Sequence, residues 1–123
     1  LFDLPLTMKQ NRKFDYIYID DLMPVLEHFI EHDPGQPVFN VTPDHAIELL
    51  TLAEKVKKIS GKDLPIKVAQ SGLGVEYSGD NARLHREMKT LSFLPIEAAI
   101  GRLYQWYADN IAMIKREYLL VDK

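Results

Sequence analysis

The hydrophobic pattern changes its period several times along this 123-residue chain. Residues 14 to 19 alternate side chains at a period of two in β-favouring residue types, which predicts a strand. From residue 22 the apolar side chains recur at helical spacing until the break DPGQP at 33 to 37, which predicts a helix. Since strands and helices keep alternating, the sequence predicts an α/β fold, or an α+β fold for this chain as an isolated fragment.

The same patterns divide the rest of the chain. A short strand at 7 to 10 is predicted to pair with 14 to 19 across the turn 11 to 13. Glycines in the stretch 72 to 79 indicate a flexible loop, with substrate contact as the alternative. The other predicted strands are 38 to 41 and 65 to 69, and the other predicted helices are a segment from Pro43 to Gly61 with Thr42 or Asp44 as its cap, a short one at 81 to 89, and a long one from Pro95 to 111.

We assign structural roles to four polar residues in or next to these elements. Asp20 or Asp21 is placed to accept a hydrogen bond from the free backbone N–H groups at the start of the first helix. Asp80 is the expected cap of the short helix, and Asn40 lies inside a short apolar strand. The two adjacent aspartates could instead hold a cation, but carboxylates at a strand-to-helix turn are more often caps, and we predict no metal site there.

Composition narrows the classes of partner. The net charge is −3, with lysines scattered among glutamates, so the chain has no basic face that could neutralise a nucleic-acid backbone. It has no cysteine, which excludes disulfides and thiolate chemistry. No apolar run approaches the roughly 20 residues that a membrane helix needs. We therefore expect a cytoplasmic protein, with residues 1 to 123 forming a single domain.

One motif matches a metalloprotease pattern. His28, Glu31 and His32 fit H-x-x-E-H, in which two histidines bind zinc and the glutamate acts as a base. On a helical wheel they flank the polar side, and no third ligand follows, so a solvated helix face is the preferred interpretation. The chain contains neither a glycine-rich phosphate loop nor a Tyr-x-x-x-Lys pair, and we assign no catalytic residue.

Five stretches form a recognisable series along the chain: FDYIYIDDL at 14 to 22, VFNVT at 38 to 42, IELLTLAEKVKKISG at 47 to 61, GDNARL at 79 to 84 and FLPIEAAIGRLYQWY at 93 to 107. Taken in order, they resemble the carboxyl-terminal part of the extended short-chain dehydrogenase/reductases. This is the NAD-dependent epimerase/dehydratase family, which acts on sugar nucleotides. Each stretch is weak alone, and their order and spacing carry the resemblance.

The resemblance implies that this chain is the substrate-binding region of a Rossmann-fold enzyme. The family's glycine-rich NAD(P) loop and its catalytic Tyr-x-x-x-Lys belong to an amino-terminal Rossmann domain, which is absent from this chain. NAD or NADP is therefore expected in the parent protein and not in this fragment, which would not turn over a sugar nucleotide alone. The family also implies that the parent could be a homodimer.

Two residues depart from the family pattern. An arginine that contacts substrate phosphate is usual where this chain has Phe14, and a second is common where it has Gln70. Either other cations replace them, or the substrate lacks the usual diphosphate. The substrate-binding candidates are Phe14, Tyr16, Gln70, Arg83 and Arg86, and Arg12 and Lys13 are further possible replacements.

Because the two arginines usual in the family are missing at Phe14 and Gln70, two other functions stay open. The chain could be a non-catalytic binding or regulatory module derived from this family. It could also be a free-standing α+β interaction domain, which would be a compact monomer.

Overall fold

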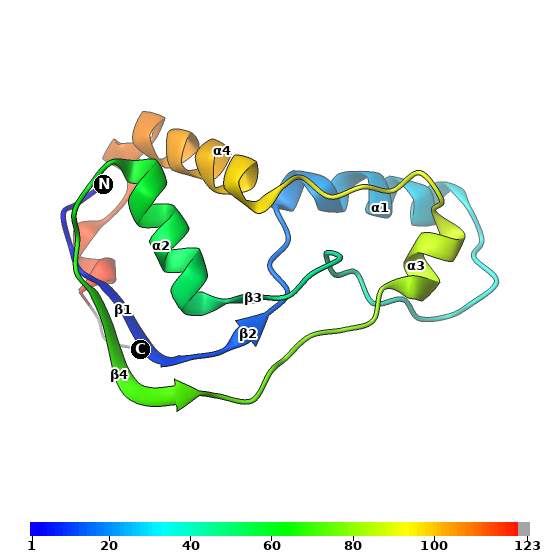
Figure 1. The fold of residues 1–123 in the computed structure, drawn as a ribbon. Helices are drawn as coiled ribbons and strands as arrows, with labels where there is room; N and C mark the ends of the chain where they lie inside the picture. The colour runs from blue at the N-terminus through cyan, green and yellow to red at the C-terminus, as the bar shows by residue number, and fades with distance from the viewer. Residues whose placement is uncertain (121–123) are drawn as a thin grey trace.

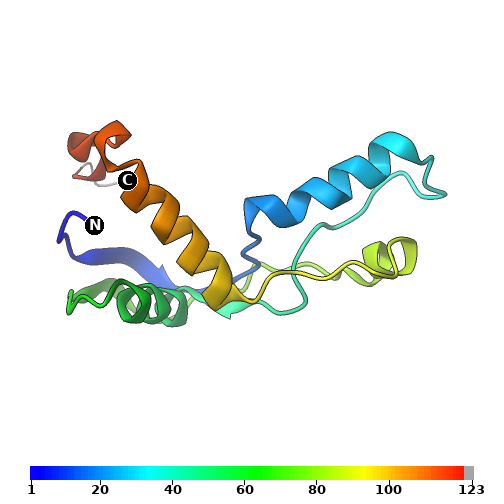
Figure 2. The same ribbon diagram turned by 90° about the horizontal axis from the view of Figure 1, so that it is seen from above.

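The computed structural model of the protein describes residues 1 to 120. Its elements fall into two parts (Figures 1 and 2): β1, β4, α2 and α4 lie on one side, α1 and α3 lie on the other, and β2 and β3 lie between them. The predicted alternation of strands and helices is confirmed. In chain order the elements are β1 (Leu6–Asn11), β2 (Lys13–Phe14), α1 (Ile19–Glu31), β3 (Ile47–Glu48), α2 (Leu49–Ser60), β4 (Ile66–Leu73), α3 (Ala82–Glu87), α4 (Ile96–Asp109) and two 3-10 turns, η1 (Ile111–Met113) and η2 (Arg116–Leu119).

The strands pair differently from the prediction. β1 pairs in parallel with β4, with Leu6 opposite Ile66 and Met8 opposite Val68. The predicted hairpin between 7 to 10 and 14 to 19 is therefore wrong, because the chain continues past β1 without reversing and enters β2. β2 instead pairs antiparallel with β3, which is two residues long.

Two predicted strands are shorter or missing. The strand predicted at 14 to 19 ends at Phe14, since its neighbours offer only the two residues of β3 and one bridge to Tyr77. The strand predicted at 38 to 41 is not formed, and side chains there bond to another segment in place of a strand ladder. Asn40 Nδ2 donates to the Asp80 carbonyl oxygen at 3.0 Å, and Thr42 Oγ1 donates to that of Gly79 at 3.3 Å.

The helix starts correct the predicted caps. α1 begins at Ile19 after Tyr18, so Asp20 and Asp21 lie within its first turn and neither is the N-cap. Their negative charges still stabilise the start of α1, because the N-terminal end of a helix dipole is positive. Asp21 Oδ2 accepts a hydrogen bond from the Leu94 backbone N–H at 3.0 Å, which ties the start of α1 to the segment before α4.

α2 begins well after Pro43, so the predicted cap at Thr42 or Asp44 is also wrong. The residue before its first turn is Glu48, whose side chain makes no capping hydrogen bond. The Leu50 N–H donates instead to Asn11 Oδ1 of β1 at 3.0 Å, so the cap comes from a distant strand. The predicted end at Gly61 is confirmed, with φ of 66° in the left-handed region that glycine tolerates.

Each part has its own buried side chains. Val25 of α1 and Leu84 of α3 are 1% and 0% exposed, and they form the centre of the α1–α3 part. Ala53 of α2, with Ala99 and Ile100 of α4, is buried where α2 and α4 pack together. The small side chain of Ala53 is consistent with close approach of the two helices. Within residues 1 to 120, no helix is long and apolar enough to cross a membrane.

Candidate functional site

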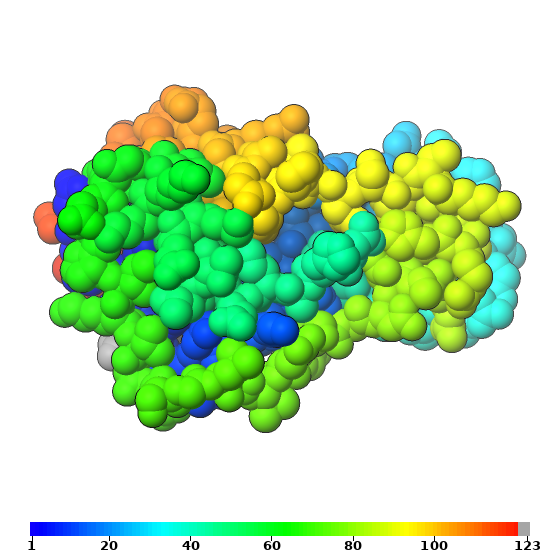
Figure 3. Space-filling view, in the orientation of Figure 1, coloured from blue at the N-terminus to red at the C-terminus, as the bar shows by residue number. Residues whose placement is uncertain are grey.

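A cavity of about 380 Å³ opens where the two parts of the molecule meet. We call it the aromatic cavity. In Figure 3, a hollow is visible between the yellow segment that precedes α4 and the teal segment near residue 45, with blue atoms of the N-terminal segment at its base. Its walls are Tyr16, Tyr18, residues 43 to 47, Lys55, residues 93 to 96 and Ala99.

A second hollow of about 320 Å³ adjoins the first, and we call it the polar pocket. Residues 43 to 46 line both hollows, so this segment is their shared wall. The rest of the polar pocket comes from two segments that are distant in sequence: Lys13 with Asp15, after β1, and Glu76 with Ser78 and Gly79. A ligand with an apolar ring and a polar extension could occupy both hollows.

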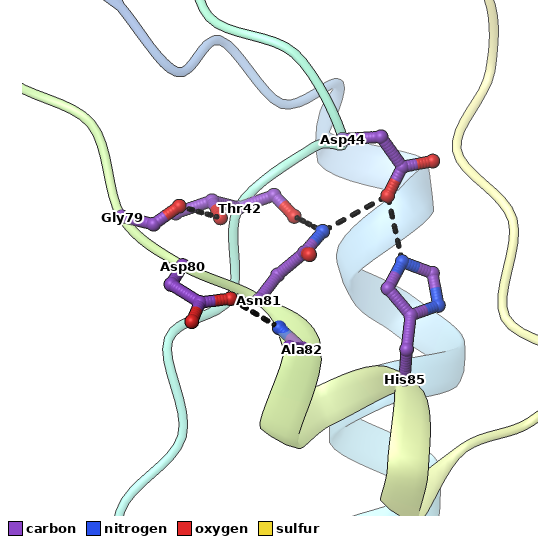
Figure 4. Close-up of polar contacts among 7 residues, drawn as sticks. All are labelled: Thr42, Asp44, Gly79, Asp80, Asn81, Ala82 and His85. Atoms are coloured by element: carbon purple, nitrogen blue, oxygen red, sulfur yellow. Dashed lines mark hydrogen bonds and ion pairs between the residues drawn. The ribbon is translucent and has the colours of Figure 1, made fainter.

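Side chains of α3 hold the shared wall in place (Figure 4). Asn81 Nδ2 donates to the Thr42 carbonyl oxygen at 2.9 Å and to Asp44 Oδ1 at 3.0 Å. His85 Nε2 lies 2.6 Å from the same Asp44 oxygen. The start of α3 is itself ordered by Asp80, whose Oδ1 accepts from the Ala82 N–H at 2.8 Å while Asn81 occupies the N-cap position. The wall and α3 therefore form one hydrogen-bonded unit.

The environment of the site shifts several pKa values. The hydrogen bond from Asn81, followed by that from His85, lowers the pKa of the Asp44 carboxyl, so Asp44 is an anionic acceptor at neutral pH. Burial raises the pKa of the Tyr16 hydroxyl, which stays protonated and can donate a hydrogen bond. Lys55 pairs with Glu97 of α4, and this contact lowers the pKa of Glu97.

These groups suit binding better than covalent chemistry. Tyrosine and phenylalanine rings offer flat apolar surface, and tyrosine adds a hydroxyl that hydrogen-bonds. Asp44 and His45 add polar atoms on the wall that faces both hollows. Among residues 1 to 120, no group of three or more histidine, aspartate or glutamate side chains is arranged to hold a metal ion.

The H-x-x-E-H histidines lie elsewhere. His28 Nε2 is 3.0 Å from Glu87 Oε1, which joins α1 to α3. His32 stacks on the His28 ring at 4.5 Å between ring centroids, and its Nδ1 lies 3.0 Å from the His28 carbonyl oxygen. The interpretation of a solvated helix face is wrong for His28, because this side chain lies in the contact between the two helices.

The structure brings together two of the five substrate-binding candidates. Tyr16 lines the aromatic cavity, and Phe14 packs edge-on against it at 6.0 Å between ring centroids. Gln70 lies on β4, paired with Gln10 and exposed. Arg83 donates from its guanidinium to the Val38 carbonyl oxygen at 2.9 Å, and Arg86 is exposed on α3. Those last three residues line neither hollow.

Sequence reasoning missed the residues that build most of the cavity. Residues 43 to 46 were interpreted as the start of a helix, and residues 93 to 96 only as the approach to one. The sequence did indicate that residues 43 to 46 precede the helix, because the regular apolar spacing of that helix starts at Ile47 and not before. Asp44 and His45, an acidic and a basic residue next to each other, precede that helix and line both hollows.

Comparison with known proteins identifies one informative relative by shape. No protein-family model and no curated protein sequence matches the chain. A solved structure, UDP-glucuronic acid 4-epimerase from Bacillus cereus in complex with NAD, matches with a TM-score of 0.62 and 21% identity. The match covers 80% of this chain and 32% of that one, so the chain spans about a third of the length of the structure it resembles. At this identity the likeness establishes the fold.

Proposed function

We propose that the chain is the substrate-binding domain, residues 1 to 123, of an NAD- or NADP-dependent sugar-nucleotide epimerase, dehydratase or reductase of the extended short-chain dehydrogenase/reductase family. The observation that carries this proposal is the match of 80% of the chain to part of an NAD-bound epimerase. The order of the five family-like stretches supports it independently, because it rests on sequence and not on shape.

The aromatic cavity supports a role in binding the sugar. A hexose ring is amphipathic, with apolar faces and hydroxyl edges, and the Tyr16 and Phe93 rings offer apolar surface for such a face. Asp44 and His45 on the shared wall would take the hydroxyls. The volume of about 380 Å³ falls at the lower end of the range for small-molecule pockets.

The chain's residues would bind and orient substrate for chemistry done elsewhere. NAD or NADP, held by a separate Rossmann domain of the parent protein, would supply hydride transfer. Here, the protonated Tyr16 hydroxyl and the anionic Asp44 would fix the ring orientation. Residues 93 to 96, which lead into the start of α4, would help exclude water from one side. Alone, the chain is expected to bind without turnover.

The proposal is tested by adding UDP-glucuronic acid to the chain and following backbone amide shifts by NMR. We expect shifts at Tyr16 and residues 43 to 46, with Tyr16→Ala weakening binding by about tenfold through loss of a stacking anchor. Tyr107→Ala is the matched control, because Tyr107 lies on α4 and lines neither hollow. Shifts confined to other segments, or equal affinity of the two variants, would contradict the proposal.

One observation favours a second candidate, a non-catalytic binding module derived from the same family. Phe14 and Gln70 stand where the family has arginines, and among the described residues no arginine lines either hollow. Lys13 lines the polar pocket and Lys55 the aromatic cavity, so a diphosphate would meet ammonium groups but no bidentate guanidinium, and a ligand without a diphosphate would avoid that loss. Turnover of a sugar nucleotide by the full-length protein would exclude this candidate, whereas tight binding without turnover would favour it.

A further inference from the structure

The side chain of His85, on α3, contacts two walls of the aromatic cavity without lining the cavity itself. Its Nε2 lies 2.6 Å from Asp44 Oδ1 on the shared wall (Figure 4). Its ring also meets the Phe93 ring edge-on, with 6.2 Å between the ring centroids and 89° between the ring planes. Asp44 and Phe93 are far apart in the sequence, and both line the aromatic cavity. His85 therefore lies behind two walls of the cavity at once.

His85 links two walls that are otherwise held separately. The shared wall is also held by Asn81, which reaches it from the start of α3. The segment before α4 is tied to α1 by the bond from the Leu94 N–H to Asp21. Among the hydrogen bonds, ion pairs and ring contacts of residues 1 to 120, only those of His85 reach both walls. The position of one wall can therefore depend on the other through this imidazole.

The charge of this link depends on pH. An imidazole ordinarily changes its charge between about pH 5 and 8. Hydrogen bonds from Asn81 and then from His85 lower the pKa of the Asp44 carboxyl, which is therefore an anion over that range. When His85 is protonated, its bond to Asp44 gains a Coulomb attraction that the neutral ring lacks. The His85 and Asp44 side chains are 33% and 52% exposed, so water screens this attraction and the effect is a few-fold one.

The charged groups around this link are few. In the part of the chain that the structure describes, Asp44 is the group with which His85 pairs. The other titratable groups on the surrounding segments are His45 on the shared wall, Arg86 and Glu87 on α3, Lys89 after it, and His28 on α1. Arginine and lysine keep their charge between pH 5 and 8, and Glu87 pairs with His28. His45 is therefore the neighbour whose titration an experiment must separate from that of His85.

We propose that His85 is a positioning residue, which holds two walls of the aromatic cavity together and does so more firmly when its imidazole is protonated. The inference rests on the proposed function only for the identity of the ligand, since both contacts are present in the chain alone. A cavity whose walls are fixed in advance binds its ligand at a smaller cost of ordering. Affinity in the aromatic cavity is therefore higher at pH 5.5 than at pH 8.

NMR of the chain without ligand tests the link itself. Between pH 8 and pH 5.5 we expect the Asp44 amide and the Phe93 ring signals to shift with the same midpoint as the His85 ring signals. His85→Gln keeps an N–H donor for Asp44 but has no ring and no proton to gain, so it should abolish these shifts. His45→Gln is the matched control, because it removes the other imidazole of this wall and should preserve them. Shifts that do not share the His85 midpoint, or that persist in His85→Gln, overturn the proposal.

Calorimetric titration with UDP-glucuronic acid at both pH values tests the consequence for binding. We expect about threefold tighter binding at pH 5.5 than at pH 8. His85→Gln should remove most of this difference, and the remainder belongs to His45, which lines the cavity. His85→Ala should weaken binding at pH 5.5 about fivefold, although its side chain lines neither hollow. His32→Gln is the matched control, because His32 is exposed on the far side of the α1–α3 contact and also lines neither hollow.

The two measurements separate this inference from the proposed function. A shared midpoint that depends on His85 in the free chain supports the link even if the sugar nucleotide does not bind. Binding whose affinity changes neither with pH nor in His85→Ala overturns the inference and leaves the proposed function standing. Affinity that changes with pH without a shared midpoint in the free chain also overturns it, because His85 then attracts the anionic ligand by its charge and does not act through the walls.

Discussion

Asn81 is the residue whose loss should loosen the shared wall of the two hollows most directly. Its amide donates to the Thr42 carbonyl oxygen and to the Asp44 carboxylate, at 2.9 and 3.0 Å. Asn81→Ala removes both bonds and leaves two acceptors that must find water. The affected segment is the one that separates the aromatic cavity from the polar pocket.

The size of the effect follows from the two bonds. A neutral hydrogen bond contributes about 1 kcal/mol to stability, and one to a charged acceptor about 2 kcal/mol. Asp44 is exposed, so water replaces part of the second bond, and we expect Asn81→Ala to lower the free energy of unfolding by about 2 kcal/mol in total. The variant should also raise the pKa of Asp44 toward its ordinary value, because Asn81 is the largest cause of its lowering.

The pH dependence has a defined sign. A carboxyl whose pKa is lowered on folding stabilises the protein above the ordinary pKa, about 3.9, and this contribution is lost as the pH falls through the folded-state pKa. The stability difference between the original chain and Asn81→Ala should therefore be full at pH 7 and shrink below about pH 4. His85 remains beside Asp44 in the variant, so part of the lowering should persist.

Urea unfolding at pH 7 and pH 3, with an NMR titration of the Asp44 carboxyl, measures both effects. Asn110→Ala is the matched control, because its amide donates to the Trp106 carbonyl oxygen at 2.8 Å on α4, away from the hollows. That variant should lose stability without changing the pKa of Asp44. If Asn81→Ala leaves the Asp44 pKa unchanged, or costs no more than the control at both pH values, the wall is not held as described.

Two further predictions concern the frame of the site. Leu84→Ala should lower the free energy of unfolding by about 3 kcal/mol, because the Leu84 side chain on α3 is fully buried. Leu103→Ala on α4 should lower it by about 1 kcal/mol or less, because Leu103 is 43% exposed. Thermal unfolding that ranks the two variants equally would contradict this assignment of the core. Gly61→Ala should destabilise by about 1 kcal/mol, because its φ is 66°, and Gly101→Ala, inside α4 with nothing within 4 Å of the added Cβ, should stabilise by about 0.5 kcal/mol in urea unfolding.

The parts of the fold that the sequence predicted are those decided by local chemistry. The helix ending at Gly61 and the long helix after Pro95 follow from apolar spacing, a glycine stop and a proline start, all within a few residues of each other. The strand at 65 to 69 was found for the same reason and continues to Leu73 in the structure.

The errors concern interactions between distant residues. β1 pairs with a strand some sixty residues away, and nothing within 7 to 10 distinguishes that parallel partner from a nearby hairpin. The alternating run at 14 to 19 has strand propensity, but propensity without a neighbouring strand gives extended chain. Its aromatic rings pack on each other and toward the cavity instead, which is why Tyr16 is found in the site.

The two aspartates after that run show why a local capping rule gave the wrong role next to the candidate site. A local rule places Asp20 or Asp21 at the N-cap, since a carboxylate there satisfies free N–H groups. Asp21 instead accepts from the Leu94 N–H, a bond that spans 73 positions and joins the start of α1 to the segment before α4. Tyr18 lies on one side of this joint and residues 93 to 96 on the other, and both are walls of the aromatic cavity. Asp21 therefore fixes the positions of two walls of the cavity relative to each other. Asn11 acts in the same way at α2, which it caps from a distant strand.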